Sequence, residues 1–347
     1  MKIEKLLDTL SLEQKIFQMF ILGFSGVSLG KDNLNIQKAV RLGLGGIILF
    51  SENIRSYSQA AKLTQNLQKI AKIPLFISID QEGGKVERTG NVKNKIKYLS
   101  PGELAAGENP EAARIQAEIM SKELKFMGIN MNFVPVIDVN TNPDNPIIGI
   151  RSFGNNPDTV IKFAKPVYET FIKNKIIPVV KHFPGHGPTG EDSHLTMPVV
   201  ELDMEELENI HIKPFKQAID DGVNAIMANH AHYKAFNKEG LPASLSHAIL
   251  NEYLREKLKF KGIVISDDMV MGGIKNYFTG YEACLKGIQA GIDVFIYRDS
   301  SEEIFELAKK LCDAVKKGEL AEDKINESVK RILICKEKFM SISNGRF

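Results

Sequence analysis

Residues 177–183 read "IPVVKHF", a run that is apolar from its start and carries Lys181 and His182 near its end. Near-continuous apolarity, in place of strict alternation, is typical of a strand that helices bury on both faces, as in a parallel sheet. This stretch therefore predicts a buried parallel strand whose carboxyl end carries polar side chains.

Seven further short apolar runs rich in β-branched residues accompany this one. They lie at residues 20–24, 45–50, 74–80, 131–138, 225–231, 262–268 and 293–297. Helix-period segments lie between them. A strand followed by a helix, repeated eight times, favours an α/β fold of the TIM (β/α)8 barrel type over an open doubly wound sheet.

The segment at 155–175, "NNPDTVIKFAKPVYETFIKNK", shows the helical pattern between two of these runs. Asn156 can cap the helix and Pro157 suits its first turn. Pro166, inside the apolar stripe, is expected to kink or split the helix. A last helix is expected to run to about residue 340, with a short tail after it. No linker, repeat or low-complexity tract divides the chain, so residues 1–347 are expected to form a single domain.

Bulk composition excludes several classes of protein. The chain is 43% hydrophobic and 25% charged with a formal net charge of +2, which argues against disorder and against a nucleic-acid or membrane partner.

Cys284, Cys312 and Cys335 are widely spaced and odd in number, so we predict reduced thiols and neither disulfides nor a zinc motif. The N-terminus lacks the features of a signal peptide, and no run is long enough to span a membrane. A cytoplasmic, monomeric protein is expected.

Polar side chains at the carboxyl ends of the predicted strands would face an active site, because the βα loops of a TIM barrel gather at that end. Those at the strand ends are Asp80, Asp138, Lys181, His182, Asn229, His230, Asp267 and Asp268. Asp267 leaves an apolar strand with no basic residue close in sequence, which indicates a catalytic carboxylate: a nucleophile, a general base or a metal ligand. Asp268 is a candidate N-cap of the following helix.

Asp80 and Arg88 bracket the segment "QEGGKVE". An aspartate accepts hydrogen bonds from sugar hydroxyls and an arginine offers a rigid fork of donors, so the two residues could hold a sugar. An internal ion pair that holds the loop is the alternative. Arg151, in the long polar loop at 139–154, leaves the same two interpretations open.

Residues 181–194, "KHFPGHGPTGEDSH", carry three histidines. A metal site is disfavoured because Pro184, Gly185 and Gly187 exclude the helix on which a His-x3-His pair would share a face. The segment also lacks the Walker spacing of a phosphate-binding loop. A purely structural role for the loop remains an alternative. A catalytic loop is favoured: Asp192 and His194, two residues apart, can pair so that the carboxylate fixes the imidazole tautomer for proton transfer.

With "KHFPGHG" followed by "DSH", "ISDDMVMGG" and "IDQEGGKVER" all present, the chain resembles family 3 glycoside hydrolases. It resembles more closely the single-domain bacterial β-N-acetylglucosaminidases of peptidoglycan recycling. The resemblance implies an exo-acting, retaining enzyme that releases terminal N-acetylglucosamine from peptidoglycan fragments or related glycans without a metal or organic cofactor. It implies Asp267 as nucleophile, His194 as general acid/base and Asp192 as the residue that orients it. The implied sugar-binding residues are Asp80, Arg88, Arg151, Lys181 and His182.

The Asp/His pair favours N-acetylglucosaminides over glucosides. By the same resemblance, the β-glucosidases of family 3 are expected to use as acid/base a Glu from a second domain that follows the barrel. Two departures from the family pattern concern Lys85, where an Arg is common, and "MANHAHY", in which Asn229 or His230 would reshape the sugar pocket. His186 is expected to be structural, and the glycines of "FPGHGPTGE" are interpreted as hinges for a catalytic loop.

Four other functions remain open from the sequence. Phosphate could intercept the glycosyl-enzyme in place of water, which would make the protein a phosphorylase. The others are a β-glucosidase-like glycosidase of the same family, a sugar-binding barrel without catalysis, and a metallohydrolase.

Overall fold

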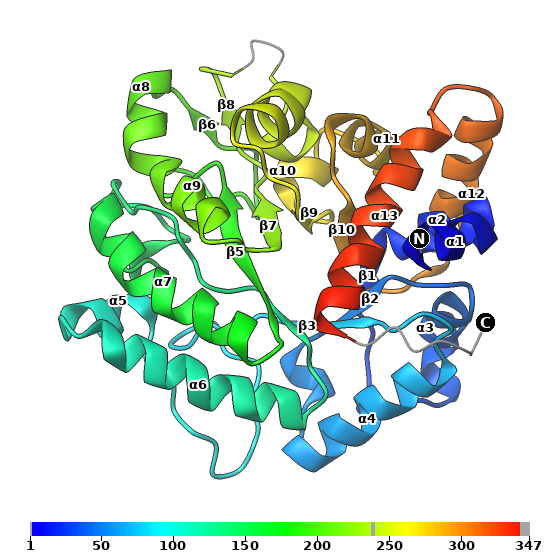
Figure 1. The fold of residues 1–347 in the computed structure, drawn as a ribbon, viewed down its shortest axis with the longest axis horizontal. Coiled ribbons are helices and arrows are strands. Elements are labelled where there is room, and N and C mark those ends of the chain that lie inside the picture. Colours follow the sequence, from blue (N-terminus) through cyan, green and yellow to red (C-terminus); the bar gives the residue numbers. More distant parts are fainter. Residues whose placement is uncertain (1, 237–239, 341–347) are drawn as a thin grey trace.

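The computed structural model describes residues 2–236 and 240–340, and the expected tail after about residue 340 lies outside them. Eight parallel strands close into a barrel in the order β1-β10-β9-β7-β5-β4-β3-β2 (Figure 1). The strands are β1 (Phe20–Leu22), β2 (Gly46–Leu49), β3 (Phe76–Ile79), β4 (Met131–Asn132), β5 (Ile177–Phe183), β7 (Ala225–Ala228), β9 (Ile263–Asp268) and β10 (Val294–Tyr297). The TIM-barrel prediction is confirmed.

Each apolar run contains one barrel strand, but most strands are shorter than their runs. In the run at 131–138 only Met131–Asn132 is ladder-paired, with one further bridge between Val136 and Lys181. The run at 225–231 leaves the barrel after Ala228. Beyond it, β8 (His232–Tyr233) pairs with β6 (Val199–Val200) in a separate two-stranded sheet. Apolar sequence thus continues into the loops because those loops are buried too.

Helices cover the outside of the barrel (Figure 1). The α-helices are α1 (Lys2–Thr9), α2 (Leu12–Gln18), α3 (Leu34–Arg41), α4 (Tyr57–Ile70), α5 (Pro101–Ala106), α6 (Pro110–Phe126), α7 (Pro157–Lys173), α8 (Met204–Glu206), α9 (Lys213–Asp220), α10 (Gly272–Lys275), α11 (Gly280–Ala290), α12 (Glu302–Lys316) and α13 (Glu322–Phe339). The 3-10 and π turns are η1 (Lys31–Asn33), η2 (Ser51–Asn53), η3 (Gly149–Arg151), η4 (Leu207–His211), η5 (Ala243–Leu245) and η6 (Ala248–Lys257).

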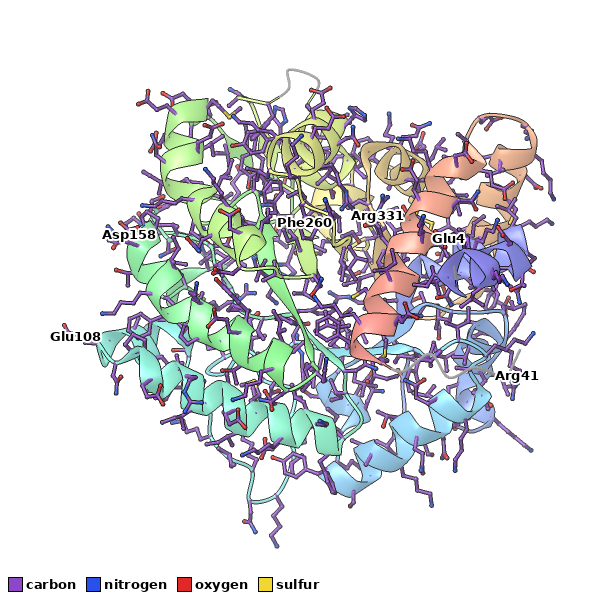
Figure 2. All side chains as sticks on the ribbon, viewed as in Figure 1. Glu4, Arg41, Glu108, Asp158, Phe260 and Arg331 are labelled. Atoms are coloured by element: carbon purple, nitrogen blue, oxygen red, sulfur yellow. The ribbon has the colours of Figure 1, made fainter. Side chains whose placement is uncertain are left out.

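The helices direct charged side chains to solvent and apolar side chains to the barrel. Charged side chains such as Arg41, Glu108 and Asp158 lie at the periphery (Figure 2), and all three are exposed. The barrel strands are buried along their whole length except at Asp267 in β9, as expected for strands covered on both faces.

The proline inside α7 does not split the helix, which corrects that part of the expectation, whereas a kink stays a prediction. Asn156 caps α7 through its side chain, and the helix runs unbroken past Pro166. Pro166 removes one backbone donor, but the apolar stripe that contains Val160, Phe163 and Phe171 is buried against the barrel. The packing of that stripe outweighs the loss of one hydrogen bond.

The N-terminal end of the barrel is closed by a buried lysine. Lys336 of α13 is fully buried, and its Nζ donates to Oε1 of Gln18 at 2.9 Å. The same Nζ lies 4.8 Å from the centre of the Phe76 ring. Gln18 in turn donates to the carbonyl of Gly43 at 2.6 Å. Packed side chains therefore fill the barrel around Lys336 at this end.

Two sequence-based expectations concern the whole chain. Cys284, Cys312 and Cys335 are free thiols and all are buried. Across the part of the chain that the structure describes, no helix combines the length and the apolar character that crossing a membrane requires.

Lys336→Met is expected to remove a pH dependence of stability. Burial lowers the pKa of Lys336 to about 7 in the folded protein, against about 10.4 in an unfolded chain. Between these values the unfolded state binds more protons, so wild-type stability rises with pH across that window. Urea titrations from about pH 6 to about pH 9 should show the wild-type free energy of unfolding rising by about 2 kcal/mol relative to the variant.

Lys338→Met provides the control for this experiment. Lys338 is exposed and its Nζ donates to Asn224, so its replacement should leave the pH dependence of stability as it is in the wild type. A constant difference between wild type and Lys336→Met across the window would contradict the assignment.

Candidate active site

A hollow with a volume of about 190 Å³ opens at the C-terminal end of the barrel strands. Seven of the eight residues predicted from the sequence line it, and the eighth, Asp192, bonds to one of the seven. The seven are Asp80, Arg88, Arg151, Lys181, His182, His194 and Asp267. The structure therefore brings together residues from the segments after β3 and β4, from β5 and its loop, and from β9.

Asp267 lies near the end of β9, and its side chain faces the hollow. Its Oδ1 accepts a hydrogen bond from the backbone N–H of Asp268 at 2.8 Å. Burial alone would raise the pKa of Asp267, but the nearby His182 and His230 lower it to about 2. The carboxylate is therefore ionised at neutral pH, and a charged carboxylate is the form that attacks an electrophilic carbon.

The neighbouring Asp268 does not cap a helix, which corrects the N-cap interpretation. Met271 occupies the N-cap position of α10. Asp268 is buried instead, with Oδ2 accepting from Nε of Arg298 at 2.6 Å and Oδ1 accepting from the backbone N–H of Val270. Arg298 follows β10 and lines the hollow, so the rule of polar residues at strand ends could have found it.

A chain of alternating charges lies along one wall of the hollow. Asp80 accepts from Nη2 of Arg88 at 3.3 Å and from Nζ of Lys181 at 2.8 Å. Lys181 also contacts Glu82 at 2.7 Å, and Glu82 accepts from both Nε and Nη2 of Arg151 at 2.9 and 2.8 Å. The ion-pair interpretation of Asp80 and Arg88 is confirmed, and both residues also face the hollow, where holding a sugar stays a prediction.

Glu82, like Arg298, lines the hollow and was not predicted from the sequence. Its side chain is 1% exposed. Burial alone would raise its pKa, but Arg151 and Lys181 hold that pKa well below its usual range. The signal was present, since Glu82 stands in "IDQEGGKVER" and two predicted cations at one site require a counter-charge.

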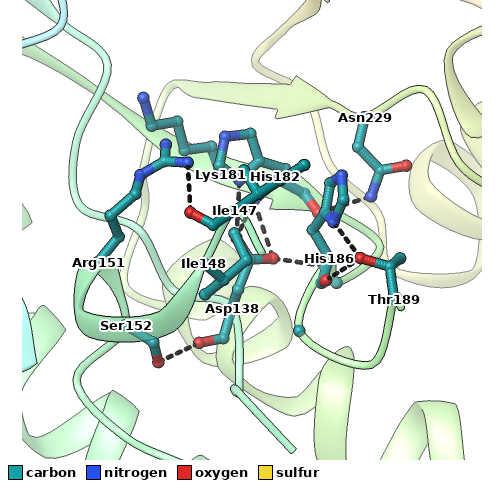
Figure 3. A network of polar contacts seen from close by, with 12 residues as sticks. Asp138, Ile147, Ile148, Arg151, Ser152, Lys181, His182, His186, Thr189 and Asn229 are labelled. Carbon is teal, nitrogen blue, oxygen red and sulfur yellow. Dashed lines mark hydrogen bonds and ion pairs between the residues drawn. The ribbon is translucent and has the colours of Figure 1, made fainter. Parts of the chain in front are cut away.

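Asp138, named as a strand end but given no role, organises the end of β5 (Figure 3). Its carboxylate accepts from Nδ1 of His182 at 2.7 Å and from the backbone N–H of His186 at 2.6 Å. Because a carboxylate only accepts, the proton of His182 is on Nδ1, which leaves Nε2 for the hollow. Figure 3 also shows Asn229, whose amide donates to the carbonyl of His182 at 3.1 Å.

Asn229 and His230 lie outside the lining of the hollow, so neither reshapes it directly. His230 bonds to Ser244 and to the carbonyl of Asp268. Asn229 and His230 bond to backbone carbonyls of residues that line the hollow, and Met227 of β7 itself faces it. Lys85 is exposed and also lies outside the lining, so the replacement of an Arg there alters no contact within it.

The loop after β5 has a buried first half. Gly185 has a φ of 130°, and a side chain there would lie 2.7 Å from Cβ of His211. A side chain at Gly187 would lie 1.8 Å from the carbonyl oxygen of Val139. These two glycines permit close packing, and the hinge interpretation of the loop stays a prediction. His186, between them, is buried, and its ring nitrogens contact Thr189 and Ser193.

Asp192 and His194 form the pair expected from their spacing. Nδ1 of His194 and Oδ1 of Asp192 are 2.8 Å apart, and the same oxygen accepts from the backbone N–H of His194 at 2.7 Å. The carboxylate fixes the proton on Nδ1, so Nε2 is available for proton transfer. The His194 side chain is 54% exposed, which leaves it in contact with solvent at the mouth of the hollow.

Within residues 2–236 and 240–340, no group of three or more His, Cys, Asp or Glu side chains is arranged to hold a metal ion. His182 and His186 direct their Nδ1 atoms at Asp138 and Thr189, respectively.

Known proteins resemble this chain in sequence. The Glycosyl hydrolase family 3 N terminal domain matches residues 11–335. "Beta-hexosaminidase A" of Pseudoalteromonas piscicida is 33% identical over 329 residues, which are 86% of this chain and 54% of that protein. "Beta-hexosaminidase" of Methylobacillus flagellatus is 33% identical over 273 residues, 77% of each chain.

Solved structures resemble the chain as well. A glycoside hydrolase family 3 β-N-acetylglucosaminidase from Paenibacillus sp. str. FPU-7 superposes with a TM-score of 0.92 at 36% identity, covering 97% of this chain and 64% of that one. The β-glucoside phosphorylase BglX bound to 2FGlc gives 0.88 at 26% identity, covering 97% and 60%. The chain thus spans about half of the Pseudoalteromonas protein and under two thirds of the Paenibacillus one. Its match to the family domain and its relatives show that the chain belongs to glycosyl hydrolase family 3.

Proposed function

We propose that the protein is an exo-acting, retaining β-N-acetylglucosaminidase. The observation that carries the proposal is the Asp192–His194 pair at the mouth of a hollow that the ionised Asp267 also lines. A carboxylate nucleophile and a separate proton donor are the two groups that double displacement at a glycosidic bond requires. The relatives named beta-hexosaminidase support an N-acetylhexosaminide as substrate.

In the first half-reaction, Asp267 attacks the anomeric carbon and forms a covalent glycosyl-enzyme. His194, protonated at Nε2, gives that proton to the departing glycosidic oxygen while Asp192 stabilises the ring through Nδ1. In the second, neutral His194 takes a proton from water, which attacks the anomeric carbon and releases Asp267. A neutral imidazole adds no second negative charge beside the carboxylate, whereas two carboxylates about 5 Å apart would raise one pKa.

The charged wall supplies the sugar-binding groups of the proposal. Arg88, Arg151 and Lys181 offer N–H donors to hydroxyl and carbonyl oxygens, whereas Asp80 and Nε2 of His182 accept from hydroxyls. Their mutual bonds orient them before a sugar enters, which reduces the entropy lost on binding. We propose terminal N-acetylglucosamine of peptidoglycan fragments and related glycans as the substrate, acted on in the cytoplasm by a monomer without a metal or organic cofactor.

The first test compares two chromogenic substrates. The value of kcat/KM for 4-nitrophenyl N-acetyl-β-glucosaminide should exceed that for 4-nitrophenyl β-glucoside by about 100-fold or more, because donors placed for an acetamido group stay unpaired with a glucoside. A preference for the glucoside would contradict the proposal and indicate a β-glucosidase-like enzyme. The absence of turnover on both would favour a sugar-binding barrel.

Phosphorolysis is the second candidate, favoured by the similarity to the β-glucoside phosphorylase. Adding inorganic phosphate to the same assay separates the two reactions. Hydrolysis predicts free N-acetylglucosamine at every phosphate concentration, whereas phosphate-dependent release of a sugar 1-phosphate would replace the hydrolase assignment.

Asp267→Ala should abolish turnover on every substrate, by about 10⁴-fold or more in kcat, because no covalent intermediate can form. Steady-state assays with purified protein measure this, and circular dichroism checks that the variant is folded. Asp220→Ala, at an exposed position on α9, is the matched control and should keep wild-type activity. Wild-type turnover in Asp267→Ala would exclude it as nucleophile.

His194→Ala should lower kcat/KM by about 10²- to 10⁴-fold on alkyl N-acetyl-β-glucosaminides, whose leaving group needs a proton. On the 2,4-dinitrophenyl glycoside the loss should be small, since that leaving group departs unprotonated. His247→Ala changes an exposed histidine outside the hollow and should affect neither substrate. Equal losses in His194→Ala on both substrates would argue against His194 as the acid.

A further inference from the structure

The end of the β5 loop is bonded directly to the segment that follows Asp267. The backbone N–H of Gly272 donates to the carbonyl of His194 at 2.9 Å, and that of Gly273 donates to the carbonyl of Ser193 at 3.0 Å. Nδ2 of Asn276 donates to the carbonyl of Leu195 at 2.8 Å. Three consecutive carbonyls around His194 are therefore held by α10 and the residue after it.

A fourth contact extends this attachment. The hydroxyls of Thr196 and Tyr277 lie 2.9 Å apart. Together, residues 193–196 contact residues 272–277 at four successive positions. The attachment is continuous, although 78 residues separate His194 from Gly272.

Glycine is needed for this approach. A side chain at Gly272 would lie 2.4 Å from the carbonyl carbon and oxygen of Leu195, far inside contact distance. One at Gly273 would lie 3.0 Å from Cβ of His230. The "MGG" sequence after β9 thus lets the two backbones meet.

The segment that holds the loop is itself fixed to the strand of Asp267. The backbone N–H of Met271 donates to the carbonyl of Asp268 at 3.0 Å, and Met269 donates to the carbonyl of Ile296 in β10. Met271, Gly272, Gly273 and Ile274 are buried. Residues 269–274 therefore form a short rigid link from the proposed nucleophile to the backbone of the proposed acid/base.

We propose that Asn276 is a positioning residue, whose amide, together with the Gly272–Gly273 backbone, sets where His194 stands relative to Asp267. The inference rests on the proposed function of these two residues. In a retaining mechanism the acid/base and nucleophile need a fixed separation of about 5 Å, and a misplacement of about 1 Å costs roughly 10²-fold in rate. His194 is half-exposed and has only Asp192 as a side-chain partner among the described contacts, so the backbone attachment carries this task.

Asn276→Ala removes the side-chain donor and leaves the two glycine contacts in place. We expect kcat/KM on alkyl N-acetyl-β-glucosaminides to fall by about 10- to 100-fold, with a change of less than about threefold on the 2,4-dinitrophenyl glycoside. A structural role alone would lower both rates alike, through loss of folded protein. Lys275→Ala, at the neighbouring exposed position of α10, is the matched control and should leave both rates unchanged.

A second measurement separates this inference from the proposed function. Asn276→Ala introduced into His194→Ala should cause no further loss on the alkyl substrate, because a residue that acts through His194 has nothing left to position. Additive losses, equal losses on both leaving groups, or unchanged rates would each overturn the inference. Equal losses on both leaving groups in His194→Ala itself would instead overturn the acid/base role of His194, while the non-additivity would still report the coupling to Asn276.

Discussion

The C-terminal end of the barrel depends on one buried charge, the carboxylate of Asp138. This side chain is fully buried, where an unpaired carboxylate would cost several kcal/mol. Burial alone would raise its pKa, but His182 and His186 hold it below the usual range. The bonds from His182 and the backbone of His186 form only if the chain after β5 turns back over β4. Asp138 can therefore be buried as a charged group because the loop after β5 brings these two donors to it.

The wall of the hollow also depends on buried charges that are paired with opposite charges. Glu82 can stay charged at 1% exposure only beside Arg151 and Lys181, and Lys181 is shared with Asp80. Lys181 and Arg151 thus bring opposite charges to Asp80 and Glu82 from other βα segments, while Arg88 pairs with Asp80 within its own segment. A ligand with many hydroxyls would meet donors and acceptors whose orientation is already set, and the ordering is complete before binding.

The two halves of the site differ in exposure. The wall and the floor are buried or half-buried, whereas the Asp192–His194 pair lies at the rim in contact with solvent. Exposure suits the proton exchange with water that we propose for His194, but it removes the packing that would hold the side chain still. The contacts of residues 193–196 with Gly272, Gly273, Asn276 and Tyr277 supply that constraint from outside the hollow.

Features that depend on neighbouring residues could be predicted from the amino-acid sequence. Buried strands appear as apolar runs, the polar residues at their ends mark the open face of the barrel, and Asp192 lies two residues from His194, so their pairing needs no long-range contact. The tertiary structure alone decided what depends on partners far along the chain. Glu82 bonds to Arg151 across 69 residues, and Lys181 bonds to Asp80 across 101.

Glycine is permissive in any sequence, so the sequence does not show what Gly185 and Gly187 pack against; the neighbouring His211 and Val139 show that close packing needs them. The physical reason is the same in each case. The energy of a buried charge or a close backbone contact is set by the atoms within about 3 Å of it, and those atoms come from other segments that meet only when the barrel closes.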